Sequence, residues 1–475
     1  MINKKPFSYL HKTPSSKIFR GIFVFSSVFL FLTYKFSSLE YRFGDQNAYF
    51  CMAKALLDGE VPYRDFLLAD PPLLVYLLAL TKKIIGENIL LFSIFPPILD
   101  TLSSLLLYTY LKRKRLNFSF LAPAIYLSSF LIISTSDYVT GLHLVLFLIN
   151  LALLFEKKPI ISGVFWGLAT LIKLYVIPGF LAFFIWQIIQ KQYGYSFKTL
   201  LTYCLTGLVA MFPFLLIAPI QVINQIIVHQ LNRPSGISKM NVYYFFFIQD
   251  FSLIIPGIIG LVWKKNWQIL LLLLSWLGFY LVFNDLYYLY LGILTPWLTI
   301  GLIDFLNQVR AKWLKDNLGY KIAISTFILI SLIHLPALLF YHQNTKQQGK
   351  FAQVGKVKQF ILNLDKKIPL YGSHEVAPLV ALITNRSLFG NYYDTNAQIY
   401  GSGAVDKKQV SLEAVENGIY LLTKVTNLPI NAKLDSGYEG YFDSEVFEKY
   451  CQRLTIINGL QKELFSDVAI YHCEK

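Results

Sequence analysis

The sequence predicts an all-α polytopic membrane protein with a small α/β domain at its C-terminal end. The 475 residues are 55% hydrophobic, and their mean hydropathy is +0.49. Before residue 342, apolar runs recur at lengths near the roughly 20 residues that a helix needs to cross a bilayer. After it, the composition turns soluble. We therefore expect a transmembrane domain over residues 1–341 and an extracytoplasmic α/β domain over residues 342–475.

The net charge of +15 indicates membrane topology and not nucleic-acid binding. The basic excess lies before residue 342, in short clusters such as Lys112–Arg115 and Lys264–Lys265 between apolar runs. Clusters of this kind mark cytoplasmic loops, so an even number of crossings must separate each neighbouring pair. This parity gives about 11 helices, with a cytoplasmic N-terminus and an extracytoplasmic C-terminus. The expected location is the cell (inner) membrane, with membrane lipids as partners and no nucleic acid.

The first apolar run is predicted to be an uncleaved helix, because no A-x-A-like cleavage site follows it. Two expected spans that are each short for a full crossing, Ile160–Leu174 and Val176–Ile189, satisfy the parity as a hairpin with a bend near Pro178 and Gly179. In chain order, the expected spans are Ile18–Phe36, Phe92–Leu111, Phe118–Ile133, Leu142–Phe155, Ile160–Leu174, Val176–Ile189, Leu200–Ile217, Val242–Val262, Trp267–Phe283, Tyr287–Phe305 and Ile322–Tyr341.

The first outer loop is the most informative part of the sequence. Residues Asp45–Leu57 have the apolar spacing of an amphipathic helix that ends at Gly59. Residues 71–86 are apolar but too short for a span, so two interfacial helices are expected. Carboxylates beside a bilayer are costly unless they are solvated, paired or used in chemistry. Asp45 is therefore interpreted as a helix N-cap, as a general base that accepts a proton from a hydroxyl group, or as both.

The C-terminal tail alternates strand-like and helix-like runs. Strands are expected at Ile419–Val425 and Val468–His472, and helices at Val376–Thr384 and Ser444–Leu454. Cys451 and Cys473 both lie in this tail, where an oxidising compartment would permit a disulfide. Two cysteines in one small domain do not by themselves decide whether the pair forms.

The order of motifs along the chain resembles a known superfamily. An Asp at the start of an amphipathic loop helix is followed by a G-x-x-P-Y-x-D-F turn at residues 59–66 and a Pro-Pro-Leu helix start at residues 71–73. A G-x-x-x-G-L-A-x-L-x-K run at residues 163–173 and the YYLYLGILTPWL segment at residues 287–298 come later. The sequence thereby resembles the GT-C superfamily of polyprenyl-phosphate-dependent glycosyltransferases. The nearest branch contains the protein mannosyltransferases (glycosyltransferase family 39) and the lipid A aminoarabinose transferase.

The resemblance implies an inverting glycosyltransferase with a GT-C-like fold and Asp45 as the catalytic base. The donor would be a sugar on a polyprenyl phosphate, and the acceptor a hydroxyl group of a lipid, glycan or protein on the extracytoplasmic face. Asp137 in the second outer loop matches an acidic residue that positions the acceptor or holds a divalent cation such as Mg²⁺ or Mn²⁺. The alternative for Asp137 is a solvated residue that caps the next helix.

This sequence departs from the pattern of the superfamily at two positions. Gln46 stands where many members have Glu, which puts a metal or proton role of that position in doubt. Asp70 stands where many members have a basic residue, so the phosphate-binding cation must come from elsewhere. Asp65 and Asp70 are interpreted as turn and positioning residues of the first loop.

The cations expected to bind the donor phosphate are Arg233, Lys173, Arg64 and His229. Cations are required there because negative charge develops on the departing phosphate. Lys173 lies deep in an apolar run, where it is either a functional residue or a side chain that snorkels to the interface. His229 and Arg233 share a loop that could equally be solvated without a ligand.

Two other functions fit parts of the sequence. An oligosaccharide ligase would depend on the loop of His229 and Arg233 and not on the first-loop carboxylates. A lipid or sugar transporter (flippase) would require interrupted spans in corresponding positions of two halves, a symmetry that the sequence does not show. No P-loop or dinucleotide-binding motif follows a predicted strand, which argues against a nucleotide-driven machine.

Overall fold

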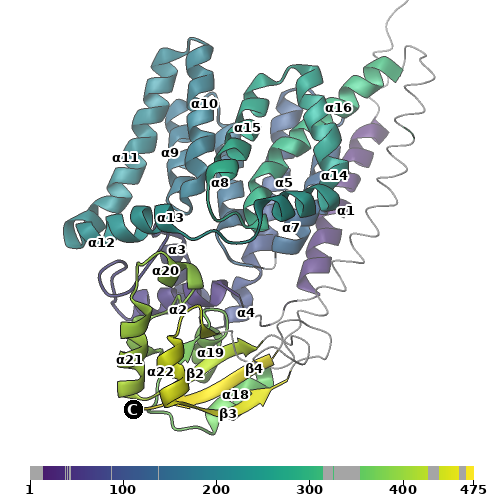
Figure 1. The fold of residues 1–475 in the computed structure, drawn as a ribbon. Helices are drawn as coiled ribbons and strands as arrows, with labels where there is room; N and C mark the ends of the chain where they lie inside the picture. Colours follow the sequence, from purple (N-terminus) through teal and green to yellow (C-terminus); the bar gives the residue numbers. More distant parts are fainter. Residues whose placement is uncertain are drawn as a thin grey trace, which may run out of the picture.

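The computed structural model describes residues 14–313 except positions 38, 40, 42, 43, 87 and 137, and also residues 325, 354–425, 438–458 and 467–475. The predicted span Ile322–Tyr341, the residue Asp137 and the predicted domain boundary at residue 341 lie outside the described residues. Figure 1 shows a body of helices at one end and a smaller α/β domain at the other.

The helical body follows the apolar runs of the sequence. Within the described residues, five helices are long and apolar enough to cross a membrane, and they lie at Lys17–Phe36, Ile89–Arg113, Tyr193–Ile217, Lys239–Lys264 and Tyr288–Ala311. Shorter apolar helices occupy the other predicted spans in this part of the chain. The principal helices are α1 (Pro14–Phe36), α5 (Phe95–Arg113), α6 (Ala122–Ser128), α7 (Phe130–Thr135), α8 (Leu142–Leu154), α9 (Pro159–Thr170), α10 (Ile177–Ile189), α11 (Tyr193–Ile217), α14 (Lys239–Lys264), α15 (Trp267–Val282) and α16 (Thr295–Trp313). The exact number of crossings stays a prediction.

The predicted span Phe118–Ile133 is not one continuous helix. A short 3-10 turn, η2 (Ser119–Leu121), comes first, and the chain then breaks at Ser129, where ψ is 134°. The buried carboxylate of Asp250 on α14 accepts hydrogen bonds from the backbone N–H groups of Phe130 at 2.9 Å and Leu131 at 3.2 Å. These N–H groups have no partner within a helix that starts there, so the carboxylate takes the place of a helix cap.

The hairpin expected over residues 160–189 is present, but its turn lies earlier than predicted. The turn runs through residues 171–176, with Lys173 in an extended conformation (φ −149°, ψ 127°) and the 3-10 turn η3 (Leu174–Val176) after it. The bend expected near Pro178 is wrong, because this proline stands in the first turn of α10, where its missing N–H costs nothing.

Glycines set the direction of the helices that flank this hairpin. A Cβ atom on Gly163 of α9 would lie 2.5 Å from the Thr199 carbonyl oxygen of α11, and one on Gly167 would lie 3.1 Å from that of Tyr203. From the first contact to the second, the chain advances by four residues in both helices, so α9 and α11 run in the same direction. Helix α10, which lies between them in the sequence, runs in the opposite direction. Small residues of this kind let two helix backbones approach closely.

Three helices connect α1 to α5, and the sequence predicted only the first two of them. They are α2 (Gln46–Leu57), α3 (Leu73–Ile85) and the short α4 (Ile89–Phe92). Figure 1 shows α2 lying between the helical body and the α/β domain. The segment that follows α11, with α12 (Pro219–Ile223), a π-helical turn η4 (Asn224–Val228) and α13 (His229–Asn232), lies at this same end of the body.

The α/β domain is a four-stranded sheet in the order β1-β2-β4-β3. Its strands are β1 (Leu370–Gly372), β2 (Ile419–Val425), β3 (Cys451–Ile457) and β4 (Asp467–Cys473). Strands β1 and β2 are parallel, and the other two pairs are antiparallel. The strands alternate apolar side chains between two faces, one packed on α18 (Val354–Leu362) and α19 (Ala377–Thr384), the other on α21 (Lys407–Asn417) and α22 (Ser444–Tyr450).

The predicted strands of the tail are confirmed, and one predicted helix is too long. Helix α22 ends at Tyr450, and the residues assigned to its last turn belong to β3. Pairing with β4 draws these residues into the sheet, and Cys451 lies opposite Cys473. The two cysteines form a disulfide, which settles the pairing that the sequence left open.

Candidate functional site

A cavity of about 1750 Å³ lies where the helical body meets the α/β domain. Its apolar part is lined by side chains of α9, α10, α11 and α15, among them Leu181, Leu205 and Leu208. Its polar part is lined by the start of α2, the loop before α3, the turn with Lys173, α13 and the loop after it, residues 283–290 and residues 374–399 of the α/β domain. An apolar groove that ends in charged groups matches the shape of an amphiphilic molecule.

Asp45 faces this cavity from the start of α2. It occupies the N-cap position, but its side chain makes no capping hydrogen bond, so the structure does not support the capping interpretation. Its Oδ1 atom instead accepts a hydrogen bond from Nε2 of His374 at 3.0 Å. The Asp45 side chain is 52% accessible, and its open side faces the cavity.

The charges around Asp45 and His374 favour the ionised form of each. Burial raises the pKa of Asp45, but the hydrogen bond and charge of His374, with the charges of Lys173 and Lys424, outweigh it and leave the pKa below its ordinary value. For His374, burial lowers the pKa, but the hydrogen bond and charge of Asp45 outweigh it and leave the pKa above its ordinary value. Asp45 is therefore ionised at neutral pH, the form that can accept a proton.

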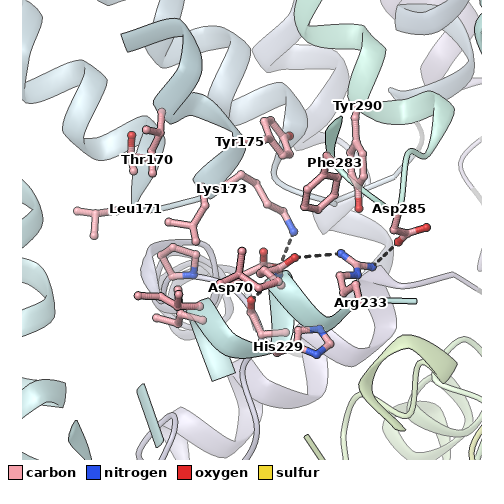
Figure 2. Close-up of a pocket in the computed structure, with 18 of the residues that line it drawn as sticks. Asp70, Thr170, Leu171, Lys173, Tyr175, His229, Arg233, Phe283, Asp285 and Tyr290 are labelled. Atoms are coloured by element: carbon pink, nitrogen blue, oxygen red, sulfur yellow. Dashed lines mark hydrogen bonds and ion pairs between the residues drawn. The ribbon is translucent and has the colours of Figure 1, made fainter. Parts of the chain in front are cut away.

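Lys173 points into the cavity and is not a snorkelling side chain. Its Nζ forms an ion pair with Oδ2 of Asp70, and it also donates to the Tyr49 hydroxyl at 3.0 Å. The Tyr49 hydroxyl in turn donates to Asp70 at 2.7 Å. Figure 2 shows the Lys173 and Arg233 side chains directed toward Asp70 from different elements.

Arg233 is the second cation of the cavity, at the point where α13 ends. Its Nη2 pairs with Oδ2 of Asp285 at 2.9 Å, and its side chain is 14% exposed. His229, one turn earlier, is buried and shares a hydrogen bond of 2.6 Å between its Nδ1 and the Ser402 hydroxyl of the α/β domain. Burial, with the charge of Arg233, lowers the pKa of His229 to about 4, so this imidazole is neutral at pH 7.

Arg64 and Asp65 lie apart from the other predicted residues. The Arg64 guanidinium pairs with the neighbouring Asp65 at 2.7 Å on an exposed turn, and Oδ2 of Asp65 also accepts from the Val61 N–H at 2.7 Å. Within the described part of the chain, the cavity lining includes neither residue. The position of Asp65 fits the expected turn role, whereas that of Arg64 does not favour a phosphate contact.

The α/β domain and the last loop contribute polar residues that the sequence did not single out. His374, Glu375 and Asp394 line the cavity from the α/β domain, and Asp285 lines it from the loop after α15. The sequence feature that could have identified His374 is its position just after a short apolar run. Functional side chains commonly follow the carboxyl ends of parallel strands. Asp285 stood next to the YYLYLGILTPWL segment.

One group of residues in the described part of the chain has the spacing of a metal site. Ligand-type atoms of Asp45, His374 and Glu375 lie within 4.8 Å of one another. Each carboxylate there already has a cationic partner, which is His374 for Asp45 and Lys424 for Glu375. Mg²⁺ prefers an octahedral shell of oxygen ligands, so a set with an imidazole and two paired carboxylates does not fit it.

The sequence matches a known protein family, and the fold matches solved structures. The family described as dolichyl-phosphate-mannose-protein mannosyltransferase matches residues 69–218, which include Asp70 and Lys173. The crystal structure of ArnT from Cupriavidus metallidurans bound to undecaprenyl phosphate is similar with a TM-score of 0.58 and 11% identity, over 97% of this chain and 98% of that chain. The chain has the GT-C fold.

The similarity to ArnT extends over both parts of the chain. The apo structure of the same ArnT matches with a TM-score of 0.58 and 10% identity, over 96% of this chain and 98% of that chain. A comparison with curated protein sequences gave no match. The apolar helices, the family match and the GT-C fold together support a multi-pass integral membrane protein.

Proposed function

We propose that this protein transfers a sugar from a polyprenyl monophosphate to an acceptor hydroxyl group on the extracytoplasmic face, with inversion at the anomeric carbon. The observation that carries the proposal is the cavity, in which one apolar groove leads to the carboxylate of Asp45 and the cations Lys173 and Arg233. The similarity to an ArnT structure bound to undecaprenyl phosphate supports a polyprenyl-phosphate partner.

The polarity of the cavity supports the following position of the donor. Its polyprenyl chain lies along the leucines of α10 and α11, and its phosphate lies between Lys173 and Arg233. Both cations are paired with carboxylates, Asp70 and Asp285, which compensate their burial before the donor arrives. Arg233 offers a planar guanidinium for two-point contact with phosphate oxygens, whereas Lys173 acts as a point charge.

The reaction is a single displacement. Asp45 accepts the proton of the acceptor hydroxyl, and the oxygen attacks the anomeric carbon from the face opposite the phosphate. The bond between the anomeric carbon and the phosphate oxygen breaks, and the electron pair leaves with the polyprenyl phosphate. Lys173 and Arg233 stabilise the charge that develops on this leaving group. The neutral imidazole of His229, held by Ser402, can hydrogen-bond the sugar or the phosphate.

The remaining predicted residues have supporting roles in this proposal. Asp70 orients Lys173, and Asp65 stabilises the turn that precedes Asp70. Asp137, outside the described residues, positions the acceptor from the second outer loop. The disulfide of the α/β domain and the basic clusters of the other loops support an extracytoplasmic site and a cytoplasmic N-terminus.

The deciding experiment substitutes Asp45 by Asn in purified protein reconstituted into liposomes. The donors are undecaprenyl-phosphate-linked pentoses and hexoses, the acceptor is a membrane extract, and the readout is release of undecaprenyl phosphate. Asp45 makes no capping hydrogen bond and Asn has nearly the same shape, so thermal stability should be unchanged. Transfer should fall by roughly 10²–10⁴, the usual contribution of a general base.

The matched control is Asp58→Asn, the same substitution at the exposed other end of α2. It should leave transfer unchanged. Wild-type turnover of the Asp45→Asn protein on a donor that the wild type uses would refute the assignment of the base. Transfer of a preassembled oligosaccharide in one step would favour the ligase alternative.

A further inference from the structure

A tight turn at residues 373–376, which follows β1, is one of the segments through which the α/β domain contacts α2. Gly372 just before it has φ +143°, and a Cβ atom there would lie 2.0 Å from the Leu422 carbonyl oxygen of β2. The same oxygen accepts a hydrogen bond from the Ser373 N–H at 2.9 Å. Only glycine fits this approach, so the sheet itself fixes where the turn begins and directs His374 toward the helical body.

Three contacts join this turn and the start of α19 to α2. The Asn47 side-chain amide donates to the Glu375 carbonyl oxygen at 2.9 Å. The Cys51 thiol lies 3.5 Å from the Pro378 carbonyl oxygen. The third contact is the hydrogen bond from His374 to Asp45. Asn47 and Cys51 are buried, so the junction is a packed interface and not a contact between exposed loops.

We propose that His374 is a positioning residue that orients Asp45 for proton abstraction, so that the α/β domain completes the catalytic site. This proposal rests on the proposed function and adds a residue to it. Asp45 lacks the capping hydrogen bond that would otherwise hold its side chain. His374 binds Oδ1, and no other described residue holds Oδ2, which is left for the acceptor hydroxyl.

The proton balance of the step is simple. The acceptor O–H bond breaks as an O–H bond forms at Oδ2 of Asp45, while His374 keeps its own proton and its hydrogen bond to Oδ1. His374 therefore holds the carboxylate without consuming the proton that the reaction moves. Other titratable groups that face Asp45 or its partner are Lys173, Lys424, Glu375, Asp394, Tyr49 and Tyr287.

Two substitutions separate orientation from charge. His374→Ala removes the hydrogen bond, and a misplaced reacting group costs about 10² in rate, so kcat should fall by about that factor while KM for the donor stays unchanged. His374→Gln keeps a donor of similar reach without the imidazole charge. It should restore most of kcat, and the acidic limb of its pH profile should move to higher pH, because a cause that lowers the pKa of Asp45 is gone.

The matched control is His472→Gln on β4, whose imidazole pairs with Glu474 at 3.8 Å. It should leave kcat and the pH profile unchanged. In an Asp45→Asn background, His374→Ala should cost nothing further, because there is no base left to orient. Thermal unfolding of each variant separates a lost fold from a lost orientation.

Failure of this proposal is distinguishable from failure of the proposed function. If Asp45→Asn abolishes transfer but His374→Ala leaves kcat at the wild-type value, Asp45 remains the base and His374 has no positioning role. If added Mn²⁺ or Zn²⁺ restores the His374→Ala protein, His374 is a metal ligand and the positioning role is also overturned. Additive losses in the double variant contradict it as well.

Discussion

Each buried cation of the cavity is held beside a carboxylate, Lys173 by Asp70 and Arg233 by Asp285. An unpaired charge in such a site would be strongly destabilising. A donor phosphate that enters must therefore share or displace these carboxylates. Asp70, which departs from the pattern of the superfamily, thus forms an ion pair with a lysine of the cavity.

At this scale we predict that Arg233→Ala lowers transfer by about 10²–10³, the usual cost of one lost contact to developing charge. Arg233→Lys keeps the charge but loses the two-point geometry, so it should recover only part of the rate. The measurement is undecaprenyl phosphate release in liposomes. Arg64→Ala, on the exposed turn outside the cavity, should be close to wild type. An equal loss in both alanine variants would show that Arg233 has no special role.

The sequence predicted the residue types of the site better than their partners. Asp45 and Lys173 were predicted because charged groups beside apolar runs are costly, and Arg233 because a departing phosphate requires a cation. All three line the cavity. Arg64 had the right chemistry, but the turn that ends at Asp65 points it away. His374 was missed because its role depends on a contact between residues 329 positions apart, which no local pattern reveals.

At the scale of elements, glycines determine which helices lie side by side. A Cβ atom on Gly260 of α14 would lie 1.9 Å from the Gly301 carbonyl oxygen of α16, and one on Gly257 would lie 2.9 Å from that of Leu298. The α14 and α16 helices therefore also run in the same direction, and α15, which lies between them in the sequence, runs in the opposite direction.

We predict that Gly260→Leu destabilises the helical body, because the side chain has no space against α16. Overpacking of this kind costs about 1–3 kcal/mol or more, which should lower the thermal unfolding temperature in detergent. The control is Gly278→Leu on α15, where a Cβ atom would meet nothing within 4 Å. If Gly260→Leu unfolds at the wild-type temperature, α14 and α16 are not in close contact.

Apolar length predicted where the described helices lie, but not where they break. The break at Ser129 depends on Asp250, more than a hundred residues away. The turn at Lys173 replaces the expected bend at Pro178, because proline is compatible with the first turn of a helix. The end of α22 likewise follows from strand pairing with β4. The differences at Ser129 and at the end of α22 come from tertiary contacts that override a local preference, whereas the difference at Pro178 follows from local helix stereochemistry.

At the scale of the whole molecule, the two parts expected from composition are visible as a helical body and an α/β domain (Figure 1). Composition did not reveal that the domain contributes side chains to the cavity. It also left open whether Cys451 and Cys473 pair, because sequence spacing alone does not bring two thiols together. Adjacent positions on β3 and β4 do so.

The proposed orientation in the membrane leads to a labelling prediction. In a Cys204→Ser background, which removes the exposed native thiol, Ser235→Cys near Arg233 should react with an impermeant thiol reagent added outside intact cells. Asn117→Cys, beside the basic cluster after α5, should react only after permeabilisation. Labelling of Asn117→Cys alone in intact cells would invert the orientation and place the cavity on the cytoplasmic side.

The apolar part of the cavity is formed by the outward-facing sides of α10 and α11, where Leu181, Leu205 and Leu208 are about half exposed. In the proposed orientation, this face meets lipid and not water. A donor would then enter sideways from the surrounding leaflet without leaving it. Saturation of the protein would depend on the surface concentration of the donor in the bilayer and not on its bulk concentration. The protein would therefore compete for its donor in two dimensions, with every other consumer of the same lipid in that leaflet.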